Sequence, residues 1–419
     1  MATDVDVQYF SHLNGLTLGN NWGDLIRLLD KALVTGIDFT QITAASIDAQ
    51  GDVHITLYAA HNAMLFQVVE LTGFAPASLN QKYRIKGVPS ATELILKPHT
   101  AIVETSITTI GAGKLASLGY DIIFRDANDV KRVYRAKNPT AQHPFIRVDE
   151  SLTSPDGTTG VYTSTYAKSA MVGLFEHMGH IDDFENPDVL QLPFDPTDPA
   201  KNWKITGTGT NVTRGWVKWF WATSDDIANN PLEAITATAT NKWEICGDSN
   251  FFYISPSLGN SSGSIGFDVK PFYGCGVVED ALVLLGTTRL LTAGNGTIWD
   301  SIPASCPLVH SELASRFYTR KAGQDSVTST AILPDYQSGQ SGIYGGTNVA
   351  PLEIPFFAIS PKTLQGVLPH VAYSGKNHSL ANQATPIISD SSMYIHCKAG
   401  FPRIDGQNGG FYFYLGEIE

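Results

Sequence analysis

Near the start of the chain, hydrophobic residues recur at helical spacing. Within residues 22–34 the apolar positions are Trp22, Leu25, Ile26, Leu29, Ala32 and Leu33. Their separation by three and four residues places them on one face of a helix. Asn21 precedes this segment as a capping residue, and Gly36 follows it where helices commonly stop. The pattern predicts one short amphipathic helix over residues 22–34.

A different period follows this helix. Val53, Ile55 and Leu57 alternate with polar neighbours, so they lie on one face of a predicted strand. Further strands are expected at residues 65–71, 82–88 and 93–97, because turn-forming residues separate these segments. Together the segments predict a small β-barrel or meander that packs on the helix.

The remainder of the chain continues as short strands between turns. The strands predicted after residue 105 are 120–126, 130–137, 145–150, 161–174, 215–222, 241–247, 251–255, 353–359, 393–398 and 411–415. We therefore expect a mainly β protein with several small antiparallel barrel or sandwich domains and one N-terminal amphipathic helix. The predicted domains are a helix-plus-β attachment module over residues 1–104, a central β-rich domain over 105–305 and a C-terminal β domain over 306–419.

The N-terminal pattern resembles a known group of proteins. The segments that carry the resemblance are 25–36 and 72–85, with a weaker match at 365–370. They are similar to virion structural proteins encoded among the tail genes of phages that infect Gram-negative bacteria. The resemblance implies a tail or baseplate protein that is assembled in the host cytoplasm and acts through contacts with other virion proteins. It brings no catalytic residue and no cofactor.

Three other virion roles stay open at this point. The chain could be a receptor-binding or glycan-binding tail protein, with a host-surface glycan as its ligand. It could be a glycan-cleaving tail enzyme, because a pair of carboxylates for glycan hydrolysis leaves no signature in a sequence. It could also be a collar or head-surface decoration protein.

Charge narrows the choice of partners. Charged residues make up 16% of the chain, against about 25% in an average soluble protein. So much uncharged surface favours a homo-oligomer or a lattice of subunits. The net charge of −12 argues against nucleic acid, because phosphate binding needs concentrated Lys and Arg. The densest basic stretch, 125–137, is interleaved with acidic residues and is expected to be a solvated hairpin face.

We expect no signal peptide, since the first six residues are acidic. No apolar run approaches the length of a membrane span.

The candidate interface residues are aromatic residues and prolines at three places in the chain. They are Trp216, Trp219 and Trp221; Pro193, Phe194 and Pro196; and Phe411, Tyr412, Phe413 and Tyr414. Strand alternation at 216–221 covers both faces with large side chains, so we expect one face to meet the core and the other a domain or a partner subunit. A sugar-stacking platform is the alternative for the tryptophans.

Candidate catalytic and metal-binding residues are few. Residues 176–183 combine two histidines with several carboxylates, but they lack H-E-x-x-H order, and Gly179 makes a helix unfavourable there. A solvated loop is therefore expected, with no metal. We expect no nucleophile elbow, and the glycine-rich stretches at 207–209 and 345–346 lack the strand, lysine and helix of a phosphate-binding loop. The four cysteines, Cys246, Cys275, Cys306 and Cys397, lack C-x-x-C spacing and are predicted to be free thiols. We expect neither a cofactor nor an enzymatic activity.

Overall fold

The computed structural model confirms a mainly β fold made of antiparallel sheets curled into half-barrels. It describes residues 3–140, 142–154, 162–209, 212–223, 233, 236, 242–257, 271–288, 308, 317–321, 327–331, 351–373, 385–397 and 410–418. Within these residues there is one α-helix, and no helix is long and apolar enough to cross a membrane.

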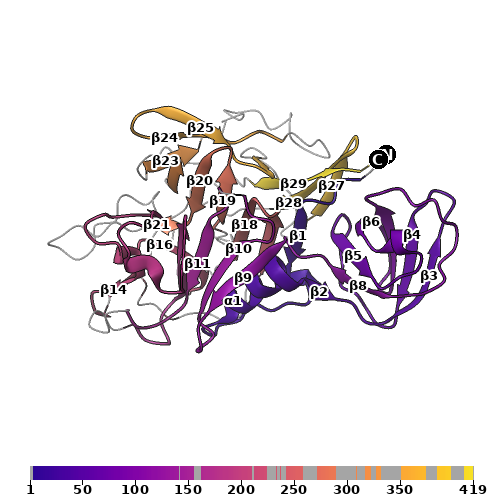
Figure 1. The fold of residues 1–419 in the computed structure, drawn as a ribbon, viewed down its shortest axis with the longest axis horizontal. Coiled ribbons are helices and arrows are strands. Elements are labelled where there is room, and N and C mark those ends of the chain that lie inside the picture. The colour runs from indigo at the N-terminus through magenta and orange to yellow at the C-terminus, as the bar shows by residue number, and fades with distance from the viewer. Residues whose placement is uncertain are drawn as a thin grey trace, which may run out of the picture.

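Residues 37–115 form a seven-stranded sheet, which we call the N-terminal half-barrel (Figure 1). Its strands in spatial order are β2 (Ile37–Asp38), β8 (Ala112–Leu115), β5 (Val68–Thr72), β6 (Lys82–Ser90), β7 (Glu93–Pro98), β4 (Val53–Leu57) and β3 (Ile42–Ile47). Val53, Ile55 and Leu57 are buried on its inner face. The period-two prediction for this region is therefore confirmed.

Two further sheets pack face to face and form the central sandwich. The nine-stranded sheet contains β1 (Gln8–Ser11), β17 (Trp243–Gly247), β18 (Phe251–Pro256), β19 (Tyr273–Val278), β20 (Ala281–Leu285), β22 (Phe317–Lys321), β23 (Val327–Ala331), β24 (Pro355–Ala358) and β25 (Thr363–Val367). The seven-stranded sheet contains β21 (Thr287–Thr288), β16 (Val217–Ala222), β12 (Lys168–Phe175), β11 (Phe145–Asp149), β10 (Lys131–Ala136) and β9 (Tyr120–Arg125), with β13 (Gln191–Leu192) beside β12. A separate hairpin pairs β14 (Ile205–Thr206) with β15 (Thr213–Arg214).

A third layer covers the other face of the nine-stranded sheet. Its strands are β26 (Val371–Tyr373), β29 (Phe411–Glu417), β28 (Ser392–Cys397) and β27 (Thr385–Ser389). Phe413 packs on Tyr9 of β1 and on Tyr253 of β18. Strands β1, β17, β18, β19 and β20 of the nine-stranded sheet thus send side chains into two cores, one on each face. Cys246, Cys275 and Cys397 are buried free thiols, as predicted, and Cys306 lies outside the described residues.

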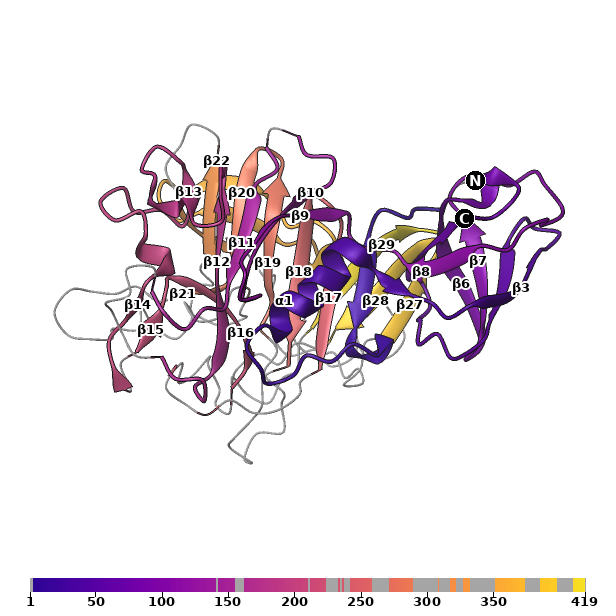
Figure 2. The ribbon, with the colours of Figure 1, turned by 60° about the horizontal axis from the view of Figure 1, so that its bottom comes forward.

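The predicted helix is present, but its partner differs from the expectation. Helix α1 (Asp24–Leu29) continues as a π-helical turn over Asp30–Thr35 and ends at Gly36. It packs on the central sandwich, where the Tyr134 hydroxyl donates to Asp30 Oδ1 over 2.8 Å. Figure 2 shows α1 beside β9 and β18, away from β3, β6 and β7. The prediction that the half-barrel packs on this helix is therefore wrong.

The start of the helix also differs from the prediction. Gly23, not Asn21, occupies the capping position, with φ of 90°. The carboxylate of Glu150, which follows β11, accepts the backbone N–H groups of Gly23 and Ile26. A carboxylate from a distant strand therefore satisfies the free N–H groups that Asn21 was expected to cap.

Two buried polar side chains join the half-barrel to the other sheets. Gln8 of β1 donates from Nε2 to the carbonyls of Val68 and Ala116, and its Oε1 accepts the Val68 N–H. Arg84 of β6 donates to four backbone carbonyls, those of Asp4, Val7, Phe66 and Leu415. Hydrogen bonds to backbone groups thus hold the half-barrel to the rest of the molecule, beside the apolar cluster of Val5, Val68 and Ala116.

The predicted domain limits stay predictions. The half-barrel extends past residue 104 to Leu115, and β1 of the first segment pairs with β17, with Tyr9 opposite Cys246. The limit after residue 305 lies outside the described residues.

Candidate functional site

The three predicted tryptophans are covered by the chain itself. Trp216, Trp219 and Trp221 are 8%, 1% and 0% exposed. The Trp219 ring packs on Phe252 and Tyr273 of the facing sheet. Trp221 meets Trp22, which precedes the helix, edge to face. The strand face that carries Trp219 and Trp221 is thus filled by distant segments of the same chain, and an interface role for these residues stays a prediction.

The C-terminal aromatic strand is likewise mostly internal. Phe411, Tyr412 and Phe413 are buried, and Tyr414 is half-buried. Phe411 and Phe413 both pack on Phe272, which joins them to the nine-stranded sheet. Only Tyr414 of this group keeps side-chain area that a partner could reach.

The proline-rich loop is tied down at several points. Pro193 is buried, Phe194 is half-buried and Pro196 is exposed. Lys201 Nζ lies 2.6 Å from Asp195 Oδ2 within the same loop. Of the three predicted residues, Pro196 presents the most surface to solvent.

The predicted loop at residues 176–183 binds protein groups. Asp182 pairs with Arg147 over 2.8 Å and with Lys131 over 3.0 Å. The Arg147 guanidinium also stacks on the Trp203 ring, 4.2 Å from its centroid. Among the described residues no group of three or more His, Cys, Asp and Glu side chains could hold a metal.

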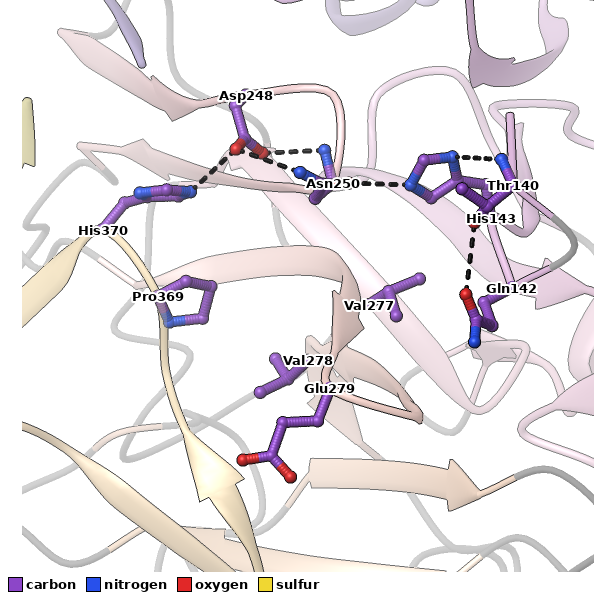
Figure 3. A pocket seen from close by; sticks show the side chains of 10 residues that line it. All are labelled: Thr140, Gln142, His143, Asp248, Asn250, Val277, Val278, Glu279, Pro369 and His370. Carbon is purple, nitrogen blue, oxygen red and sulfur yellow. Dashed lines mark hydrogen bonds and ion pairs between the residues drawn. The ribbon is translucent and has the colours of Figure 1, made fainter. Parts of the chain in front are cut away.

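A pocket of about 400 Å³ lies where the three layers meet (Figure 3). Four segments that are far apart in the sequence line it: the β10–β11 connection, the β17–β18 turn, the β19–β20 turn and the loop before β26. Its polar lining comprises Thr140, Gln142, His143, Asp248, Asn250, Glu279 and His370, and its apolar lining Val277, Val278 and Pro369.

A chain of hydrogen bonds crosses the inner wall of this pocket. The backbone N–H of Thr140 donates to His143 Nδ1 over 3.0 Å. His143 Nε2 lies 2.8 Å from Asn250 Oδ1. Asn250 Nδ2 donates to Asp248 Oδ2, which also lies 3.1 Å from His370 Nε2. One polar network therefore links all three layers of the sandwich.

Asp248 is the anchor of this network. Its Oδ1 accepts the backbone N–H groups of Asn250 and Phe251. Burial on its own would raise the pKa of this carboxyl, but the bond from His370 and the backbone N–H groups outweigh burial and lower the pKa. Asp248 is therefore a charged acceptor at neutral pH, with both oxygens occupied.

The remaining polar groups of the pocket lie at its rim. Glu279 is exposed in the β19–β20 turn with φ of 53°, and its carboxylate has no hydrogen-bond or ion-pair partner among the described residues. Gln142 is exposed on the opposite side. The inner network is saturated, so it suits a structural joint better than acid–base chemistry.

Sequence reasoning did not identify this site. Asp248 and Asn250 lie between the predicted strands 241–247 and 251–255, and no role was predicted for His143 or His370. His370 stands at the end of the segment used for the resemblance. No local motif marks the network, because its members come from separate loops.

Comparisons with known proteins give little further information. No family of known proteins matches the sequence, and neither does any curated protein. Among solved structures the chain is similar to "Phage phi92 endosialidase", with 10% sequence identity and a TM-score of 0.14. The match covers 92% of this chain and 51% of that one, so this chain spans about half its length. At this TM-score the two backbones do not superpose as one fold, and nothing is carried over.

Proposed function

We propose that this chain is a structural component of a tailed-phage virion, in the tail or baseplate, and that it acts by assembly with other virion proteins. The resemblance of residues 25–36 and 72–85 to such proteins supports this role. The proposal includes no catalytic activity.

The observation that carries the proposal is the outer edge of the half-barrel. Strand β3 has the uncharged sequence Ile-Thr-Ala-Ala-Ser-Ile and, in the part of the chain that the structure describes, pairs only with β4. Soluble proteins usually protect such an edge with charges, proline or a covering element. Two large apolar side chains on the half-barrel are also exposed, Tyr58 at 78% and Val103 at 87%. An uncharged edge strand on the same half-barrel as exposed apolar groups favours a surface that another subunit covers.

The pocket offers less support for glycan cleavage. A retaining or inverting glycosidase needs two carboxyl groups free to act on the substrate. Asp248 has both oxygens occupied by protein donors. Among the described residues that line the pocket, Glu279 is then the one carboxylate whose oxygens have no protein partner.

The test places a charge on the edge strand. Ala44 is exposed on β3, and Ala44→Lys adds an ammonium group where an incoming strand would pair. In a phage whose own copy of the gene is deleted, we expect wild-type protein in purified particles at a fixed copy number by quantitative mass spectrometry. Ala44→Lys should lower that amount by about tenfold or more.

The matched control is Gln50→Lys, which adds the same charge in the exposed turn after β3. It should enter particles at the wild-type level. If wild-type protein is expressed but is missing from purified particles, the virion role is wrong. If both variants assemble normally, the virion role survives and the β3 edge is not the contact.

A further inference from the structure

One hydrogen bond in the β10–β11 connection, which lines the pocket, requires an uncharged histidine. His143 is buried, and its Nδ1 accepts the backbone N–H of Thr140. A ring nitrogen can accept a hydrogen bond only when it carries no proton. The proton of the neutral ring is therefore on Nε2, which donates to Asn250 Oδ1 (Figure 3).

A second proton on this ring has a direct geometric consequence. Protonated Nδ1 is a donor, so it would face the Thr140 N–H as donor against donor. The bond from Nε2 to Asn250 would persist, since Nε2 donates in both states. The Thr140 N–H then loses its acceptor, whereas the bond from the His143 backbone N–H to the Thr140 carbonyl, over 3.1 Å, does not depend on the ring.

Each element that lines the pocket contributes a charged or titratable side chain to the surroundings of His143. Arg135 of β10 donates from Nε to the His143 carbonyl. Asp248 lies beyond Asn250, and Glu279 and His370 line the same pocket. The two carboxylates favour a positive charge in the pocket, whereas Arg135 opposes it.

We infer that His143 is an acid-sensitive acceptor: protonation of its ring frees the Thr140 N–H at the rim of the pocket, while the other hydrogen bonds of the joint persist. Histidine is the side chain whose charge changes near neutral pH, and its bonding partners decide what that change does.

The opposite wall responds in the other direction. His370 Nε2 faces the Asp248 carboxylate, so a proton on His370 strengthens that contact. The His370 carbonyl also accepts the Tyr414 N–H, and the Pro369 carbonyl accepts the Tyr253 hydroxyl. Acidification therefore removes one hydrogen bond at the rim of the pocket and leaves the C-terminal sheet attached.

Two measurements on the full chain test the inference. With ¹⁵N-labelled histidine, the NMR shifts of His143 at about pH 7.5 should show the tautomer protonated on Nε2. Hydrogen exchange should show the protection factor of the Thr140 amide falling by about tenfold or more between about pH 7.5 and pH 5.5. The protection factor removes the ordinary pH dependence of amide exchange.

The informative variant is His143→Asn. Its side-chain oxygen can accept the Thr140 N–H at every pH in this range, so protection should change by less than about twofold. The matched control, His180→Asn, removes a histidine whose side chain is 67% exposed and should retain the wild-type response.

Three results would overturn the inference: a tautomer with the proton on Nδ1, full protection of Thr140 at acid pH in the wild type, or an equal loss of protection in His143→Asn. The first two need no variant, so a failure of His143→Asn to fold does not remove the test.

Discussion

At the scale of single residues, buried charges connect distant elements. Glu150 illustrates the cost, because its carboxylate is buried at the start of helix α1. Burial raises the pKa of Glu150 to about 8, although the Gly23 and Ile26 N–H groups favour the charged form. The folded protein therefore prefers this carboxyl protonated over part of the neutral range.

We predict a loss of stability with rising pH that Glu150→Gln abolishes. A pKa raised above its ordinary value means that the folded state binds the extra proton, so stability is full below about pH 4.5 and is lost as pH rises through about pH 8. Each unit of pKa difference corresponds to about 1.4 kcal/mol. Urea unfolding at several pH values should show the free energy of unfolding of wild type falling relative to that of Glu150→Gln.

The matched control for this experiment is Glu185→Gln, at an exposed carboxylate. It should follow the wild-type pH dependence. A Glu150→Gln protein whose stability runs parallel to wild type from acid to alkaline pH would contradict the pKa assigned to Glu150.

At the scale of elements, the sequence predicts which helices and strands form, but not which of them pack against each other. The alternation of Val53, Ile55 and Leu57 is a property of one strand, and it appears in the structure with little change. The Trp216–Trp221 segment carries large side chains on both faces, and that pattern is the same whether a partner or the chain itself covers it. The helix prediction likewise carried no information about the sheet that receives the helix.

The helix therefore provides a test of element packing. Leu29 is fully buried in the core shared with the central sandwich, and Leu29→Ala should cost about 2–5 kcal/mol. Hydrogen exchange should show protection lost first in β10 at Val133 and Tyr134, while the β6–β7 hairpin keeps its protection. Earlier exposure of the half-barrel would show that the helix stabilises the half-barrel instead.

The control for Leu29→Ala is Lys31→Ala, at an exposed position of the adjoining π-helical turn. We expect its free energy of unfolding to lie within about 0.5 kcal/mol of wild type.

At the scale of the whole molecule, three layers and a half-barrel meet at polar joints that leave no local sequence signal. His143, Asp248 and His370 come together only after the sheets have packed. No spacing rule links residues that are more than a hundred positions apart, so the pocket could not be predicted. The Arg84 clamp is equally hidden, because its acceptors are backbone carbonyls, which every residue has.

The whole-molecule prediction on chemistry is negative. Incubation with host lipopolysaccharide, capsule and peptidoglycan should release no saccharide or reducing ends. Glycan hydrolysis needs two available carboxyl groups. Among the described lining residues Asp248 is fully hydrogen-bonded, so Glu279 has no carboxylate partner for this reaction. Saturable release that disappears in Glu279→Gln would instead identify a glycan-cleaving enzyme. Release that survives in Glu279→Gln would place such an activity outside this pocket.

The clamp made by Gln8 and Arg84 has a mechanical consequence. Two covalent connections enter the half-barrel, one at Gly36 and one after Leu115, and both could act as hinges. Gln8 ties strand β1 to Val68, and Arg84 ties β6 to residues at both ends of the described chain. A force applied to the half-barrel is therefore transmitted through β1 into the nine-stranded sheet as shear across its hydrogen bonds. These hydrogen bonds therefore oppose rotation of the half-barrel about its two covalent connections.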